Sequence, residues 1–167
     1  MLITEKYGNL HSSEISNKNV DALRIEWHET GKRILHKTTK SGIGVTLKFL
    51  NENPNFKEGD ILWQDESSLI AVEIIPVECI VVTSDSVIAV AALCYEIGNR
   101  HLPLFSEKNE LLIPYNTPLY NLLHSSGYLI RIEERKLNNP FKTTVLPHVQ
   151  VSVNGSIPTK IHQLSSL

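Results

Sequence analysis

One histidine in the second half of the chain offers the clearest chemistry in this sequence. The tetrapeptide Gly98-Asn99-Arg100-His101 places a lone imidazole at the end of an apolar helical stretch and ahead of a predicted β-hairpin. Imidazole is a good ligand for Ni²⁺, Cu²⁺ and Zn²⁺, and the affinity order among these ions does not select nickel. A single imidazole cannot hold an ion alone. His101 therefore either receives further ligands from elsewhere or is a structural histidine at a helix end.

The side chains near this histidine do not have the spacing of a catalytic site. Cys94 is the nearest candidate partner, but seven residues along a helix separate the two by about 10 Å, beyond hydrogen-bond reach. Glu96 lies about 140° away from His101 around a regular helix, so these two cannot chelate one ion. The sequence contains no HExxH motif and no Gly-rich phosphate loop. An enzyme, such as a metal-dependent hydrolase, is therefore a weaker interpretation than a binding protein.

Four other histidines and both cysteines are interpreted as structural or solvated side chains. The histidines lie in polar segments, in strand-like alternations or near a helix end, where a cation suits the helix dipole. The cysteines show neither CxxC nor zinc-ribbon spacing, so we interpret them as small buried hydrophobic residues. These residues are His11, His28, His36, His124, Cys79 and Cys94.

Composition excludes several classes of protein. The 167 residues are 41% hydrophobic and 20% charged, which is ordinary for a globular protein. A net charge of -2 gives no basic face for nucleic acid and no polybasic membrane tether. The longest apolar run, residues 87–95, is far shorter than the roughly 20 residues that span a bilayer. Because the first seven residues lack the apolar core of a signal peptide, we expect a cytoplasmic protein.

The first half of the chain has the alternation of β-strands. Leu23, Ile25 and Trp27 alternate with polar residues, and residues 43–49 repeat the pattern. Glycine, proline and asparagine separate these short runs, and no helical window lies among them. The pattern predicts a small antiparallel β sandwich or barrel over residues 1–79.

The periodicity changes after Thr83. A helix is predicted to begin at an N-cap at Ser84 or Asp85, followed by a hairpin over 102–114 that turns at residues 107–109. A second helix is predicted from an N-cap at Thr117 to Gly127, and then a last strand. The order βαββαβ is ferredoxin-like, so residues 80–137 form an α+β domain, with a weakly ordered tail over 138–167. The apolar stripe of the first helix comprises Val87, Val90, Ala91, Cys94 and Ile97, and His101 extends it.

The residues around this histidine resemble a known family. The block Cys94-Tyr95-Glu96-Ile97-Gly98-Asn99-Arg100-His101-Leu102-Pro103-Leu104, with Leu111-Leu112-Ile113-Pro114-Tyr115 after it, resembles the signature of the urease accessory protein UreE family of nickel metallochaperones. Weaker similarity runs through residues 23–33 and 58–62. The resemblance covers roughly residues 20–137 and implies the β domain and ferredoxin-like domain described above.

The resemblance also implies how the lone imidazole acquires partners. Family members are homodimers through the second domain, where the motif histidine meets its symmetry mate, so His101 would bind Ni²⁺ together with its copy, and Zn²⁺ or Cu²⁺ could substitute. A tail histidine would complete the site, His148 before His162. Asn99 and Arg100 would support the site rather than bind the ion, because arginine has no acceptor.

The sequence departs from the family pattern in two ways, and one other function remains as an alternative. Many members carry a histidine where Glu96 stands, and many end in a His-rich tail that this chain lacks. A carrier is therefore expected rather than a store of ions. The partners implied are a urease accessory GTPase and the urease apoenzyme. The alternative is a non-catalytic protein-interaction module in which His101 is structural.

Overall fold

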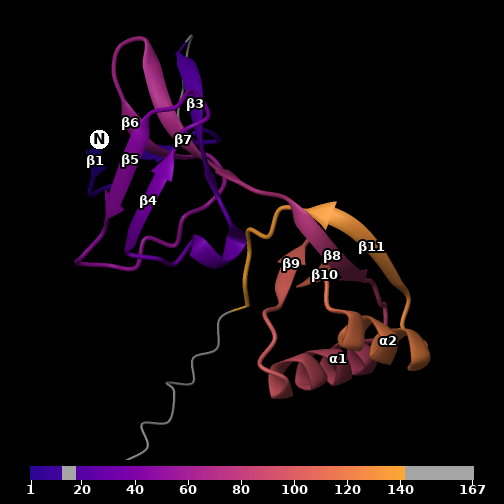
Figure 1. Ribbon diagram of the computed structural model, residues 1–167. Helices are drawn as coiled ribbons and strands as arrows, with labels where there is room; N and C mark the ends of the chain where they lie inside the picture. The colour runs from indigo at the N-terminus through magenta and orange to yellow at the C-terminus, as the bar shows by residue number, and fades with distance from the viewer. Residues whose placement is uncertain (13–17, 142–167) are drawn as a thin grey trace, which may run out of the picture.

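The computed structural model describes residues 1–12 and 18–141 and shows two units joined near Pro76 (Figure 1). Among these described residues, the first unit holds seven strands, and the second holds four strands and two helices that lie together on one side of the sheet. None of the helices in the described part of the chain is long and apolar enough to cross a membrane.

The first unit is β-rich, as the alternation predicted. Its strands form two sheets, in the orders β1-β5-β4 and β2-β6-β7-β3. A short 3-10 helix, Trp27–Glu29, follows β3 where the alternation would have continued the strand. The strands are β1 (Leu2–Ile3), β2 (Gly8–Asn9), β3 (Asn19–Ile25), β4 (Ile34–Thr38), β5 (Gly44–Lys48), β6 (Asp60–Gln64) and β7 (Ser68–Ile74).

The pairing in this unit is mixed rather than purely antiparallel. β3 pairs with β7 in parallel, from Asn19 opposite Ser68 to Ile25 opposite Ile74, and β1 pairs with β5 in parallel. Partners this far apart in the chain have connections long enough to permit either direction. Side-chain alternation records only which face is buried, so it predicted the strands but not their direction.

The second unit has the predicted ferredoxin-like order. Its strands pair antiparallel in the order β11-β8-β10-β9, and β8 belongs to this sheet from Val77 onward. Lys108 and Asn109, with φ of 46° and 67°, form the two-residue turn between β9 and β10. The elements are β8 (Val77–Val82), α1 (Val87–Asn99), β9 (Phe105–Glu107), β10 (Glu110–Pro114), α2 (Thr117–Ser125) and β11 (Ile130–Arg135).

Both helices begin within two residues of the predicted caps. Ser86, rather than Ser84 or Asp85, caps α1, and its Oγ accepts the Ala89 N–H at 3.3 Å. Asn116, rather than Thr117, caps α2 and accepts the Leu119 N–H at 3.0 Å. Any of these adjacent polar residues can cap a helix, so the choice depends on where the backbone leaves the strand.

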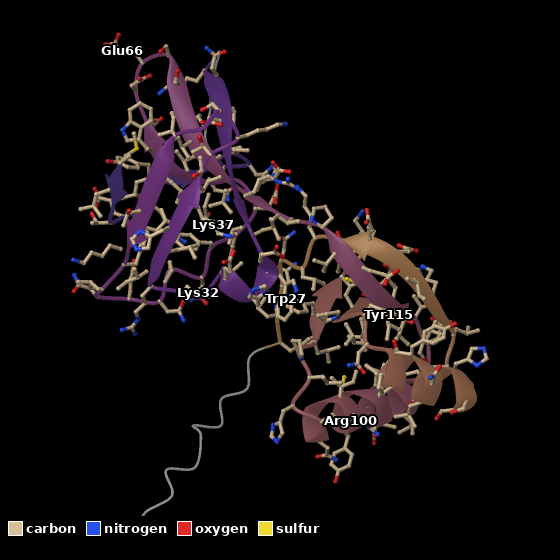
Figure 2. The ribbon with its side chains drawn as sticks, viewed as in Figure 1. Trp27, Lys32, Lys37, Glu66, Arg100 and Tyr115 are labelled. Carbon is tan, nitrogen blue, oxygen red and sulfur yellow. The ribbon has the colours of Figure 1, made fainter. Side chains whose placement is uncertain are left out.

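One face of the second sheet packs against the helices and the other against the first unit. Trp27 of the 3-10 helix packs on Phe105 of β9 with ring centroids 5.6 Å apart and an edge-to-face angle of 84°. Figure 2 shows Trp27 at the junction of the two units. The Lys136 Nζ lies 2.8 Å from the Glu58 Oε1 across the same junction. The two units therefore touch through an apolar cluster and an ion pair.

The replacement Trp27→Ala should loosen this junction. Because Trp27 is half-buried, losing its contacts should cost about 2 kcal/mol, less than the roughly 3–5 kcal/mol typical of a fully buried Trp. Urea unfolding should show the loss, and small-angle scattering should show a more extended particle.

The matched control is Trp63→Ala, because Trp63 packs against the core of the first unit and not at the junction. This variant should lower stability without extending the particle. Unchanged scattering from Trp27→Ala would show that the junction does not depend on this ring.

Candidate metal centre

The helix that was predicted to carry His101 on its apolar stripe ends two residues earlier. Asn99 is the last residue of α1, and Arg100 is its C-cap. The His101 N–H donates to the Gly98 carbonyl at 3.0 Å, and the Leu102 N–H donates to the Ile97 carbonyl at 3.2 Å. This pair of bonds is a Schellman motif, which satisfies carbonyls that the helix end leaves free. His101 therefore lies beyond the helix, where its side chain is exposed.

The backbone of His101 is left-handed, with φ of 54°. This position after a C-cap usually holds glycine, because a side chain there costs about 1 kcal/mol. The next residue, Leu102, packs against the core that contains Ile97, so the turn is held from its buried side. A histidine where glycine would fit better, with a fixed backbone and a free ring, is the pattern of a residue kept for its side chain.

The neighbours of His101 are engaged with each other. The Arg100 Nε donates to the Glu96 Oε1 at 2.7 Å, and both side chains are more than two-fifths exposed. Figure 2 shows Arg100 on α1. Asn99 is exposed, and no hydrogen bond of the described residues joins the side chain of either residue to His101. The structure thus pairs Glu96 with Arg100 rather than with the histidine.

One copy of the chain does not assemble a metal site from its described residues. Within residues 1–12 and 18–141, no three His, Cys, Asp or Glu side chains gather closely enough to hold an ion. The other predicted ligands, His148 and His162, lie outside the described residues. Any ion held by His101 therefore needs ligands from those residues, a second copy or water.

The cysteines add nothing to such a site. Cys79 is fully buried, and burial raises the pKa of its thiol to about 11, with nearby Arg135 opposing this only in part. A thiol must lose its proton to bind a metal, so Cys79 acts as a small hydrophobic residue. Cys94 is half-buried on α1.

The predicted apolar stripe of α1 was wrong in joining its two sides, because it grouped the exposed Val87 with the buried Ile97. Leu93 and Ile97 face the core, whereas Val87, Ile88 and Tyr95 point outward and are 80%, 78% and 73% exposed. A helix that is apolar on both sides normally has partners on both sides. The sequence did indicate a helix that is apolar on more than one side, because Glu96 is the only charged residue of α1.

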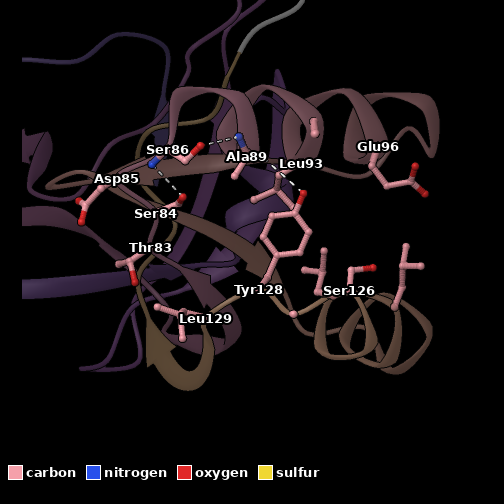
Figure 3. Close-up of a pocket in the computed structure, with 14 residues that line it drawn as sticks. Thr83, Ser84, Asp85, Ser86, Ala89, Leu93, Glu96, Ser126, Tyr128 and Leu129 are labelled. Atoms are coloured by element: carbon pink, nitrogen blue, oxygen red, sulfur yellow. Dashed lines mark hydrogen bonds between the residues drawn. The ribbon is translucent and has the colours of Figure 1, made fainter.

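A cleft of about 770 Å³ lies between α1 and α2 (Figure 3). Three of its hydroxyl groups have structural partners, since Ser84 and Ser86 accept backbone N–H groups and the Tyr128 hydroxyl donates to the Ala89 carbonyl. Its acidic side chains, Asp85 and Glu96, stand at opposite ends of α1 in Figure 3. Its described lining contains no histidine or cysteine.

Comparison with known proteins identifies the family. The model of the UreE urease accessory protein N-terminal domain matches residues 3–75, and that of the C-terminal domain matches residues 77–155. The chain belongs to the UreE urease accessory protein family. It is 41% identical to the urease accessory protein UreE of Flavobacterium johnsoniae, over 89% of this chain and 90% of that protein. It is 35% identical to those of Helicobacter pylori and Acetivibrio thermocellus, over 94% and 84% of this chain and 95% and 91% of theirs.

Membership of the UreE family confirms the resemblance first carried by residues 94–104. It also agrees with the two-part fold, since one model matches the β-rich unit and the other the ferredoxin-like unit. The family consists of accessory proteins rather than catalysts, in line with the interpretation of the sequence.

The replacement His101→Gly should make this UreE family member more stable than His101→Ala. Glycine adopts a left-handed backbone without steric cost, so His101→Gly should exceed His101→Ala by about 0.5–1 kcal/mol in the free energy of unfolding. Urea titration followed by circular dichroism measures the difference. A control pair at Gly127, whose φ is 78°, should show the same preference, with Gly127→Ala less stable than the native chain. Equal stability of the two His101 variants would show that the turn is not strained.

Proposed function

We propose that this protein is a cytoplasmic nickel metallochaperone that carries Ni²⁺ to the urease maturation machinery. Its membership of the UreE family supports the role, since the relatives are named urease accessory proteins. We infer the metal site from the exposed ring of His101, which follows a helix with an exposed apolar face. The partners in delivery are a urease accessory GTPase and the urease apoenzyme.

Two copies of the chain supply the first two ligands. An isologous two-fold contact brings a residue on the symmetry axis close to its own copy. The outer face of α1 ends near Gly98, just before His101, so pairing of these faces brings the two imidazoles towards the same axis. Burying Val87, Ile88 and Tyr95 contributes on the order of 1.5–3 kcal/mol each. Six such side chains per dimer match the cost of association, on the order of 4–15 kcal/mol.

The tail supplies the remaining protein ligands in this proposal. The Phe141 N–H donates to the Leu104 carbonyl at 2.8 Å, three residues from His101. The seven residues from Phe141 to His148 can span up to about 24 Å, which is long enough to reach from Phe141 to His101. His162 can also reach, but a longer loop costs more entropy to close, so His148 is the better candidate. Asn99 and the Glu96-bound Arg100 flank the ligand without binding the ion.

The resulting shell of imidazole, oxygen and water suits a carrier. Such a shell holds Ni²⁺ less tightly than a thiolate cage, and Zn²⁺ or Cu²⁺ can enter it as well. Arg100 pairs with Glu96, and the exposed ring of His101 is available to the ion. The site therefore forms between subunits and can release its ion when the ligands separate.

Replacement of His101 should abolish tight nickel binding. In titration calorimetry the native protein should bind one Ni²⁺ per dimer, and His101→Ala should lose this site while light scattering still shows a dimer. The control His36→Ala removes an exposed histidine that contacts Thr46 in the first unit, so it should bind nickel normally. One Ni²⁺ per dimer in His101→Ala would contradict the proposal. A protein-interaction module with a structural His101 would take up no nickel at micromolar concentrations.

A charge on the outer face of α1 should separate the subunits. The variant Ile88→Glu places a carboxylate in the proposed interface, so light scattering should show a monomer and nickel affinity should fall at least tenfold. Ile34→Glu is the matched control, since Ile34 is 52% exposed on β4 of the other unit. If Ile88→Glu remains a dimer with native nickel affinity, the interface lies elsewhere.

A further inference from the structure

The two outer strands of the second sheet differ in how they are covered. At one border, Pro140 forms an antiparallel bridge with Phe105 of β9. At the other border, β11 pairs with β8, and no strand of the described part of the chain lies beyond it. Figure 1 shows β11 along the outer border of the second unit. An edge strand of six residues is a ready template for pairing with another strand.

The backbone groups of alternate residues of β11 point away from the sheet. The Tyr115 N–H donates to the Glu78 carbonyl, so Glu78 turns its backbone groups towards β10, and its neighbours in β8 turn theirs towards β11. Arg131, Glu133 and Arg135 lie opposite those neighbours and therefore hold the hydrogen bonds with β8. The residues between them face outward, and no hydrogen bond of the described residues engages their backbone groups. They are Ile130, Ile132 and Glu134.

These outward residues are spaced symmetrically about Ile132. A second copy of β11 can lie antiparallel to the first, related by a two-fold axis through Ile132. Ile132 then lies opposite its own copy, and Ile130 lies opposite the partner's Glu134. In an antiparallel pair, residues opposite each other with outward groups exchange both of their N–H···O bonds. All of the outward backbone groups of both strands therefore find a partner in this register.

The charges of β11 favour the same register. Arg131 and Glu133 flank Ile132 and lie on the face of the sheet opposite the helices. With the axis through Ile132, Arg131 lies opposite the partner's Glu133, in the type of pair whose side chains approach most closely. An axis through Glu134 would instead oppose two carboxylates, which is destabilising. An axis through Ile130 would leave half of the strand unpaired, because β11 begins at that residue.

Charged residues on an edge strand can also serve to prevent pairing. Here the charges alternate in sign and are already ordered within their own subunit. Arg131 bonds to Glu110 and Glu133, and Arg135 bonds to Glu107 and Glu110. Side chains that are already held lose little entropy when an opposite charge arrives. The charges of this edge therefore select a partner strand of matching pattern, and β11 of another copy has that pattern.

We propose that β11 is a self-association surface, which pairs with β11 of another copy about a two-fold axis through Ile132 and continues the sheet from one subunit into the next. The Ile132 side chain, which is 42% exposed, meets its own copy at the centre. Figure 1 shows α1 and β11 on different sides of the second unit, so this contact leaves the outer face of α1 open. The contact does not depend on the proposed nickel site, and it joins the proposed dimers into larger assemblies. Because two short edges bury little surface, the association is weak and reversible.

Charge reversal in the full chain tests the register. In sedimentation, the mass of the native protein should rise over about a hundredfold range of concentration. Arg131→Glu opposes carboxylates across the axis and Glu133→Arg opposes guanidinium groups, so each variant alone should associate at least about tenfold more weakly. An equal mixture of the two should regain native association, because each supplies the charge that the other needs. The matched control Arg24→Glu, at a 54% exposed position on the edge strand β3 of another sheet, should associate normally.

Hydrogen exchange reads the edge itself. The outward Ile132 amide should exchange more slowly as the concentration of native protein rises, but not in Glu133→Arg. The inward Arg131 amide should be protected at every concentration, which also shows that the variant remains folded. A constant mass of the native chain, or a mixture that does not regain association, would overturn the proposal. Protection of the Ile132 amide that is independent of concentration would also overturn it, because the edge would then be covered within its own subunit. Nickel binding by His101→Ala is measured separately and bears only on the metal site.

Discussion

The way α1 ends determines how the side chain of His101 is presented to solvent. The Schellman bonds from His101 and Leu102 terminate the helix, and the packing of Leu102 into the core fixes the turn from below. His101 must then adopt a left-handed backbone, which costs about 1 kcal/mol for a residue with a side chain. The backbone of His101 is thus fixed while its ring is exposed to solvent. A fixed backbone lowers the entropy lost when a side chain binds, which favours the metal site that we propose at this turn.

The loop that follows this turn connects His101 to the rest of the molecule. It leads within four residues to Phe105, which contacts Trp27 of the first unit and forms a bridge with Pro140, in the segment after β11. Three separate parts of the chain therefore meet one residue of β9.

The site that we propose between two copies fits the small number of candidate ligands gathered in the described part of one copy. Within the described residues, no group of side chains in one subunit forms a metal cluster around the exposed His101, and the outer face of α1 is apolar and exposed. Both features suit a half-site that becomes complete when two subunits meet. A carrier benefits from this division, because separating or rearranging the ligands lowers affinity at the moment of transfer. An enclosed cage within one subunit would hold the ion more tightly and release it more slowly.

The sequence by itself determined the elements and singled out His101, because both depend on local patterns. The alternation of strands, the βαββαβ order and the hairpin turn at residues 107–109 depend on neighbours, and His101 stands out by residue type and motif. Tertiary structure decided what depends on distant partners. The parallel pairing of β3 with β7, the contact of Trp27 with Phe105 and the bridge between Phe105 and Pro140 all join residues far apart in the chain. The left-handed turn was also hidden, because periodicity extends a helix until packing ends it. No local pattern records such long-range contacts, so only the folded chain shows how His101 is held.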